Sequence, residues 1–224
     1  MSTRHVVLLD LDGTLIDSAP GILAGIRAAF EAVDLAPPDD GLMRAWIGPP
    51  VRETLQRELG PHGDAAVEQA NAAFRAYFDT TGAYQSVPFE GIHDALAAVA
   101  QAGALMSVVT HKPLPLAELA VAQHGLDAYI DGIHAPPSPQ VAVPKEQLFA
   151  EALDATRPHT VISVGDRGSD IRAAATHGVG GIGVAWGYGD TAELRDAGAL
   201  AVLLAAADLP AGVVAPGGGR HPAA

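Results

Sequence analysis

The sequence contains no cysteine among its 224 residues. This absence excludes a disulfide framework, a cysteine nucleophile and any metal site built from thiolates. An uninterrupted apolar run of about 18 residues is also missing, so we expect no membrane-spanning helix. The apolar stretch near the N-terminus is too short for a secretory signal. We therefore expect a cytoplasmic protein without a membrane partner.

Positive charge is scarce. Lysine and arginine together number 13 against 26 aspartates and glutamates, which gives a net charge of −13. Lysine occurs twice, at Lys112 and Lys145. Such a chain repels the backbone of nucleic acids, so we expect no nucleic-acid partner. It also repels phosphorylated small molecules, so a phosphate site would need local cations.

What the chain does contain is typical of a globular protein. Hydrophobic residues make up 49% and charged residues 17%. This balance argues against disorder. The length suffices for one large core, or for a core with a smaller second lobe. The sequence does not separate a monomer from a homodimer.

A short apolar segment runs directly into two acids. Residues 6–9 read Val-Val-Leu-Leu without polar alternation, which is typical of a strand buried on both faces of a parallel sheet. Asp10 and Asp12 follow at its carboxyl end, where open α/β sheets bind ligands, and Gly13 allows a sharp turn. Two such close carboxylates favour a shared cation, so we interpret them as a metal-assisted nucleophile and acid/base pair. The alternative is helix capping with an Asp-Gly turn.

The rest of the chain alternates between helical and strand patterns. Residues 17–86 show helical periodicity without a strand pattern and predict an inserted helical lobe. Further apolar segments predict strands at 104–109, 129–133, 161–164 and 181–184, with a short edge strand at 201–204. The intervening segments, among them 171–177, predict helices.

This alternation predicts an α/β fold with a doubly wound parallel sheet of about five strands. We expect a core from residues 1–16 and 87–210 and a helical domain at 17–86. Because residues 211–224 are rich in glycine and proline, we expect them to form a loose tail.

Polar residues follow three of the predicted strands. Thr110 follows the strand at 104–109, and Asp166 follows that at 161–164, with Asp170 four residues later. Since parallel strands gather their carboxyl ends at one edge, these side chains should meet Asp10 there. Oxygen ligands select a hard cation, and Mg²⁺ fits best because it also binds substrate phosphate. Asp170 either joins this site or caps the helix that follows it.

Both lysines fall in loops that should face this edge. A compact ammonium suits a phosphoryl oxygen or a nucleophilic carboxylate. For Lys145 we favour a role in the site over an exposed lysine at a helix start. For Lys112 we favour the reverse, a residue that starts the next helix after Thr110.

Taken together, these segments resemble the four motifs of the haloacid dehalogenase superfamily of phosphohydrolases, in the right order. The matching segments are Asp-Leu-Asp-Gly-Thr-Leu at 10–15, Val-Val-Thr at 108–110, Lys145, and Gly165-Asp166 with Asp170. Val-Thr-His-Lys-Pro at 109–113 and Gly-Tyr-Gly at 187–189 are most similar to the phosphoglycolate phosphatase-like branch. The similarity covers about residues 4–209. It implies a Rossmann-like core and a cap domain formed by the helical insertion.

The resemblance implies a magnesium-dependent phosphatase acting on a small phosphorylated metabolite, with phosphoglycolate as one candidate. Asp10 would attack phosphorus and form an aspartyl-phosphate, and Asp12 would act first as acid and then as base. Thr110 and Lys145 would hold the phosphoryl group. The dehalogenases of the superfamily lack the second acid, so Asp12 favours phosphate chemistry.

The same resemblance implies the ligand sets. Mg²⁺ would be held by Asp10, Asp12 through its backbone carbonyl, and Asp166, with Asp170 as a further candidate. The substrate-binding candidates are Gly13, Thr14, His111 and Arg52.

Two segments depart from the family pattern. His111 stands where close relatives carry Asn or Ser, so it either touches substrate or is a plain loop histidine. The order Pro-Lys-Glu at 144–146 differs from the usual Lys-Pro and makes the alignment of Lys145 less secure, with Lys112 as the other lysine available.

Arg52 follows a Gly-Pro-Pro segment that resembles the substrate-closing loop of the cap. It either reads a substrate carboxylate or second phosphate, or is a solvated helix arginine.

Three other functions fit the same pattern. They are a 5′-nucleotidase-type phosphatase, a phosphomutase, and a non-catalytic binding module.

Overall fold

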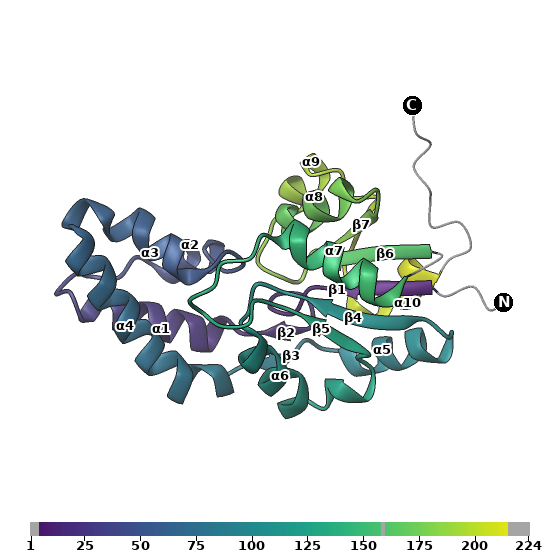
Figure 1. The fold of residues 1–224 in the computed structure, drawn as a ribbon, viewed down its shortest axis with the longest axis horizontal. Coiled ribbons are helices and arrows are strands. Elements are labelled where there is room, and N and C mark those ends of the chain that lie inside the picture. The colour runs from purple at the N-terminus through teal and green to yellow at the C-terminus, as the bar shows by residue number, and fades with distance from the viewer. Residues whose placement is uncertain (1–4, 158–159, 215–224) are drawn as a thin grey trace. The chain divides into compact units, whose positions relative to one another are not determined.

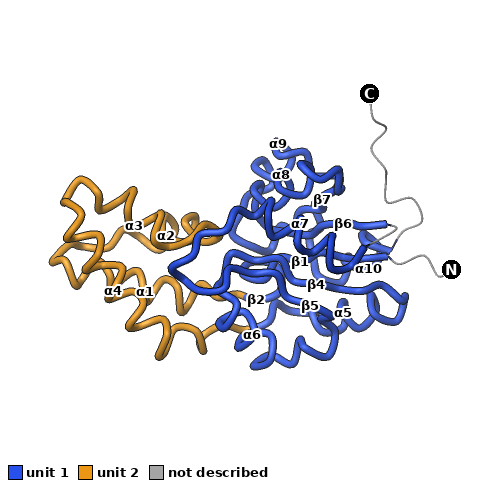
Figure 2. Tube along the Cα trace, in the orientation of Figure 1, with its two compact units in different colours: residues 1–16, 88–224 blue, residues 17–87 orange. Residues whose placement is uncertain are grey.

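The computed structural model describes residues 5–157 and 160–214 (Figure 1). Its contacts divide the chain into two compact units (Figure 2). Residues Met1–Ile16 and Pro88–Ala224 form the first, which we call the core unit, and Asp17–Val87 form the second, the helical unit.

The core unit is built on a parallel sheet. Within the described residues it has six strands in the order β5-β4-β1-β6-β7-β8. The strands are β1 (His5–Leu9), β4 (Leu105–Val109), β5 (Gly132–His134), β6 (Thr160–Gly165), β7 (Gly180–Val184) and β8 (Ala201–Leu203). The predicted α/β fold is thus confirmed, and β8 is the predicted edge strand. The β5 strand starts later than the expected residue 129 because the N–H groups of Tyr129 and Ile130 still donate to the carbonyl of Leu126 and extend the preceding 3₁₀ turn.

Strand β1 lies in the middle of this sheet and is buried on both faces. Val7 and Leu9 pack into one apolar cluster with residues of α5, α6 and α10. Val6 and Leu8 pack into a second cluster with residues of α7 and α8 (Figure 1). This double burial explains why the strand is a continuous apolar run. The core-unit helices are α5 (Ile92–Gln101), α6 (Leu114–Gln123), α7 (Lys145–Thr156), α8 (Gly168–Thr176), α9 (Thr191–Asp196) and α10 (Leu209–Val214).

Two boundaries in the core unit differ from the expectation. Helix α8 begins at Gly168 and not at 171, because the Asp170 side chain accepts a hydrogen bond from the backbone N–H of Arg167 and caps the first turn. The tail expected from residue 211 is wrong for 211–214, which belong to α10. Leu209 and Val213 are one turn apart and buried, which secures this helix. The remaining tail residues, 215–224, lie outside the described residues.

The helical unit contains α1 (Ala19–Glu31), α2 (Asp40–Ala45), α3 (Val51–Leu59) and α4 (Asp64–Thr80). Helices α1 and α4 pack against each other through apolar faces. The rings of Phe74 and Phe78 stack with centroids 5.4 Å apart. Two short strands, β2 (Ile16–Asp17) and β3 (Val87–Pro88), pair where the chain passes from one unit to the other. Across the described part of both units, every helix is too short or too polar to cross a membrane.

Candidate active site

The loop after β1 holds its two acids through its backbone. The N–H of Asp10 donates to the carbonyl of Val164 at 2.9 Å, which continues the pairing with β6. The N–H of Gly13 donates to the carbonyl of Ile16 at 2.9 Å and closes a tight turn. Gly13 has φ of +90°, a conformation that favours glycine. The motif is therefore a rigid turn that fixes the backbone of Asp10 and Asp12.

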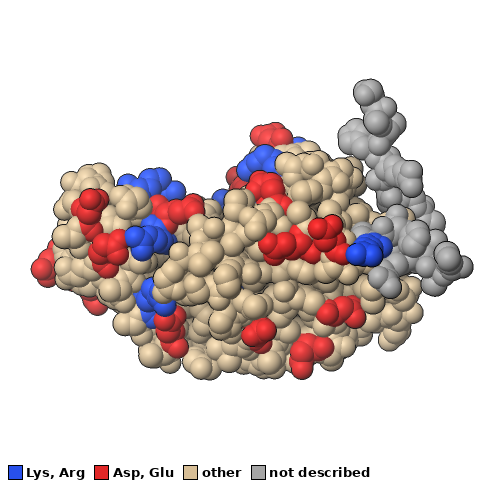
Figure 3. Space-filling model, viewed as in Figure 1, with Lys and Arg blue, Asp and Glu red and all other residues tan. Residues whose placement is uncertain are grey.

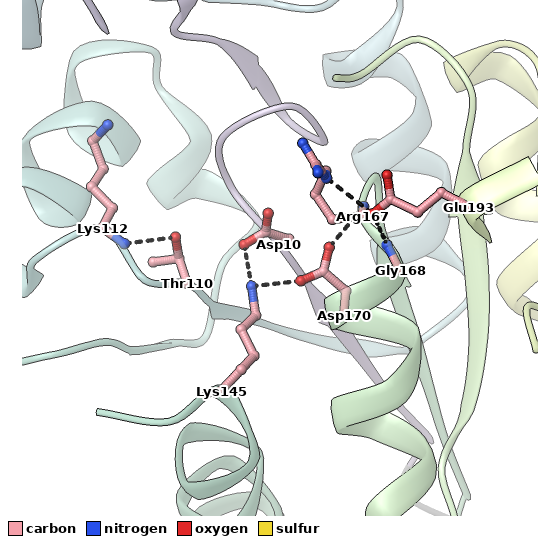
Figure 4. A network of polar contacts seen from close by, with 8 residues as sticks. All are labelled: Asp10, Thr110, Lys112, Lys145, Arg167, Gly168, Asp170 and Glu193. Carbon is pink, nitrogen blue, oxygen red and sulfur yellow. Dashed lines mark hydrogen bonds and ion pairs between the residues drawn. The ribbon is translucent and has the colours of Figure 1, made fainter. Parts of the chain in front are cut away.

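Asp10 lies in a buried network of charges from three elements (Figure 4). The Nζ of Lys145, at the start of α7, is 2.6 Å from Asp10 Oδ1 and 2.9 Å from Asp170 Oδ1. The three side chains are at most 8% exposed. Asp170 thus caps α8 through one oxygen and contacts Lys145 through the other, so the capping alternative is realised, while its role as a metal ligand stays a prediction.

Asp166 follows β6 and is fully buried. Its Oδ2 accepts a hydrogen bond from the N–H of Tyr188 at 2.7 Å. Its Oδ1 is buried and has no hydrogen-bond partner among the described residues. A Cβ placed on Gly187 would lie 2.3 Å from the Asp166 Cβ, so the Gly-Tyr-Gly segment lets backbone pack directly against this carboxylate.

These acids fit a metal ion. Oxygen atoms of Asp10, Asp166 and Asp170 lie within 4.8 Å of one another. Within residues 5–157 and 160–214 the buried Oδ1 of Asp166 has no donor, and a cation would satisfy it. A donor set made of oxygen alone suits Mg²⁺. The carboxylate of Asp12 is not part of this cluster, and ligation by its backbone carbonyl stays a prediction.

Burial and mutual repulsion set the pKa values in the cluster. Burial and the charge of Asp170 raise the pKa of Asp10 to about 7 against the opposing effect of Lys145. Burial, Asp170 and Asp10 raise the pKa of Asp166. Burial alone would lower the pKa of Lys145, but the contacts with Asp10 and Asp170 raise it overall. Near neutral pH, Asp10 is therefore partly protonated in the cluster alone, and a cation bound there would favour its ionised form.

Asp12 is held by the second lysine. The Nζ of Lys112 is 2.9 Å from Asp12 Oδ1 and 3.3 Å from Oδ2. The Lys112 side chain is 5% exposed and that of Asp12 15%. The interpretation of Lys112 as a plain helix-start residue missed this pair. The signal that could have found it is the rarity of lysine combined with a position just after a strand.

Thr110 lies at the carboxyl end of β4 and is 2% exposed. Its N–H donates to the carbonyl of His134, and its hydroxyl accepts from the N–H of Lys112 at 3.1 Å. His111 beside it is half-buried. Thr14 Oγ1 is buried without a hydrogen-bond partner in the described chain. The structure thus brings all these residues to the same edge of the sheet as Asp10, and their contacts with substrate stay predictions.

Arg52 belongs to α3 of the helical unit. It is exposed and forms an ion pair with Glu68 of α4 at 2.5 Å. Its proposed contact with substrate stays a prediction.

Sequence reasoning did not find Glu193 of α9. Its Oε1 accepts from the N–H of Gly168 at 2.7 Å and from Nε of Arg167 at 3.1 Å (Figure 4). The side chain therefore fixes the turn that carries Asp166 and Asp170. Glu193 and Gly168 are 25 positions apart in the sequence, so no local pattern indicated this contact.

Comparison with known proteins gives a consistent picture. The sequence model of haloacid dehalogenase-like hydrolases matches residues 7–184. Tyrosine-protein kinase PtkA of Mycobacterium tuberculosis is 35% identical over 83% of this chain, which spans 63% of that protein. A 5′-nucleotidase of Pseudomonas aeruginosa is 31% identical over 84% of this chain and 86% of its own length. A phosphoglycolate phosphatase of Pectobacterium atrosepticum is 33% identical over 83% of this chain and 82% of its own length.

Solved structures agree with this result. A predicted phosphatase from Clostridium acetobutylicum superimposes with a TM-score of 0.86 and 27% identity. The match covers 95% of this chain and 99% of that one. With the family model spanning most of the chain, and with the motif acids gathered at one edge of the sheet, the protein is a haloacid dehalogenase-like hydrolase.

Proposed function

We propose that the protein is a magnesium-dependent phosphatase that hydrolyses small phosphate monoesters through a covalent phosphate on Asp10. The observation that carries this proposal is the buried cluster of Asp10, Asp166 and Asp170, in which Lys145 pairs with Asp10 and Asp170 and one Asp166 oxygen has no hydrogen-bond partner among the described residues. The phosphatases among the relatives and structural neighbours support the same chemistry.

Each side chain has a role that its position allows. A carboxylate oxygen of Asp10 attacks phosphorus in line and the ester oxygen leaves with its electron pair. Asp12 gives that oxygen a proton and later takes one from the water that hydrolyses the aspartyl-phosphate. Lys145 orients Asp10 and, with the hydroxyl of Thr110, donates to phosphoryl oxygens.

The same cluster supports the proposed use of a metal ion. Asp10, Asp166 and Asp170, with the backbone carbonyl of Asp12, would hold Mg²⁺. Bound there, the ion would favour the ionised form of Asp10 and would neutralise charge on the phosphoryl oxygens. The raised pKa of Asp10, about 7 in the cluster alone, gives this contribution a physical reason.

The first prediction is chelator-sensitive release of phosphate. A panel of phosphoglycolate, nucleoside 5′-monophosphates, sugar phosphates and an aryl phosphate is assayed with Mg²⁺ and with EDTA. We expect turnover with Mg²⁺ alone, and a loss of at least about a thousandfold in Asp10→Asn, which lacks the nucleophile. Circular dichroism of the variant checks that it folds. Release of phosphate that survives EDTA, or an active Asp10→Asn, would contradict the proposal.

The same panel separates the substrate candidates. Phosphoglycolate is the candidate that the Pectobacterium relative suggests, and a 5′-nucleotide is the one that the Pseudomonas relative suggests. The similarity to a protein named a tyrosine kinase adds a third question, namely whether the phosphate on Asp10 passes to an acceptor hydroxyl and not to water. Including a tyrosine peptide and a sugar phosphate as acceptors answers it and also tests the phosphomutase alternative.

A further inference from the structure

We propose that Lys112 is a positioning residue that holds the carboxylate of Asp12 in the orientation needed to protonate the leaving group. This inference rests on the proposed phosphatase function. It gives a role to a lysine that the chemistry described above does not use.

Strand pairing brings the two residues together. β1 and β4 are neighbours in the sheet, with Leu9 opposite Val108, so the loops that follow them lie side by side. The backbone N–H of Lys112 donates to the hydroxyl of Thr110, and the N–H of Leu114 donates to the carbonyl of Pro136 at 2.8 Å. These two hydrogen bonds fix the backbone on both sides of Lys112, and the Lys112 side chain extends from this fixed loop to Asp12.

The ion pair fixes the part of Asp12 that the backbone leaves free. The turn at Gly13 fixes the main chain, but a carboxylate can still rotate about its side-chain bonds. The ammonium of Lys112 lies within 3.3 Å of both oxygens, in a setting where neither side chain is more than 15% exposed. Because buried pairs are screened less than surface pairs, this contact restricts the rotation of Asp12.

Lys145 cannot take over this task. Its ammonium is engaged with Asp10 and Asp170. Each acid of the Asp-Leu-Asp motif thus has its own lysine, and these are the two lysines of the chain.

The need for an oriented acid depends on the leaving group. An alkoxide is a strong base and leaves only when it is protonated, whereas p-nitrophenolate leaves without a proton. Loss of orientation at Asp12 should therefore affect alkyl phosphates selectively. A lysine that merely stabilised the fold would affect both ester classes alike.

The kinetic test is Lys112→Met, measured as kcat/KM on the best alkyl phosphate and on p-nitrophenyl phosphate. We expect a fall of about 10- to 100-fold for the alkyl ester and a change within about threefold for the aryl ester. Lys112→Arg, which can keep the pair, should recover part of the alkyl activity. Arg75→Met, which removes one positive charge from the exposed Arg75–Asp79 pair, is the charge-matched control and should change neither value.

An equal loss on both esters, or no loss on either, would overturn the inference. So would an effect confined to KM, which would indicate direct contact with substrate. A wild-type protein that releases phosphate from no ester would contradict the proposed function. An active wild type with an insensitive Lys112→Met would contradict the inference alone.

A second test does not depend on turnover. Labelling lysine with ¹⁵N at Nζ gives two side-chain ammonium signals, which Lys112→Arg and Lys145→Arg assign. Asp12→Asn should shift the Lys112 signal and leave that of Lys145 close to its wild-type position, and Asp10→Asn should do the opposite. A Lys112 signal that does not respond to Asp12→Asn would show that the pair does not hold Asp12 in solution.

Discussion

The carboxyl group of Asp10 lies between two opposing influences. Burial favours its neutral form and Lys145 favours its charged form, and burial prevails, with a pKa of about 7 compared with an ordinary value of 3.8. Between these two values the folded metal-free protein binds more protons than the unfolded chain, so the contribution of Asp10 to stability falls as the pH rises. Without metal, Asp10→Asn should therefore gain thermal stability relative to wild type between pH 5 and pH 8.

Melting temperatures of both proteins at the two pH values, in EDTA, measure this difference. Groups that do not contact Asp10, such as the half-buried His134 with its lowered pKa, titrate alike in both proteins and cancel in the comparison. Added Mg²⁺ should raise the melting temperature of the wild type more at pH 8 than at pH 5, because it binds the ionised acids. A difference between the two proteins that does not change with pH would contradict this assignment.

In helix α8, Asp170 stabilises the first turn of the helix and also contacts a lysine of the candidate active site. Asp170 accepts from the N–H of Arg167 and so caps the helix, while its other oxygen contacts Lys145. Asp170→Asn keeps an oxygen for the cap and removes the charge, whereas Asp170→Ala removes both. The alanine variant should thus be less stable than the asparagine variant by about 1 kcal/mol, the usual net contribution of one hydrogen bond. Urea unfolding without metal measures this, and equal stabilities would contradict the capping role.

The whole molecule carries a charge of −13, and Figure 3 shows acidic side chains spread over the visible faces of both units. In the absence of substrate, the two lysines are paired with the acids of the site. An anionic ester therefore approaches against a repulsive field. Raising ionic strength from about 20 to 200 mM at constant Mg²⁺ should increase kcat/KM a few-fold, while kcat should change little, since salt screens the approach and not the chemistry. Steady-state kinetics measure this, and a fall in kcat/KM would indicate an attractive field at the site.

Prediction from sequence succeeded where a single local pattern determines the outcome. The unbroken apolar run of β1, the acids after it and the alternation of strands and helices indicated the parallel sheet and the edge where Asp10, Thr110 and Asp166 lie. Prediction failed for contacts between residues that are far apart in the sequence. The ion pair joins Lys112 to Asp12, which are 100 positions apart in the sequence. The hydrogen bond from the N–H of Gly168 to Glu193 depends on how α9 packs. Residues 211–214 were wrongly predicted to be part of the tail, because the proline and glycine in α10 are typical of a loop. The helix is stabilised by the burial of Leu209 and Val213, which the local sequence does not indicate.

The burial of both lysines also determines how readily their ε-amines react with acylating reagents. An ε-amine reacts with an acylating reagent only when it is unprotonated and accessible, and here Lys112 and Lys145 are each within 3 Å of a carboxylate oxygen and nearly excluded from solvent. The outer surface thus offers no lysine side chain for acylation, glycation or amine coupling. An acylated lysine found after exposure to such reagents would mark an opening of the candidate active site, so the extent of lysine acylation would report how often this site opens.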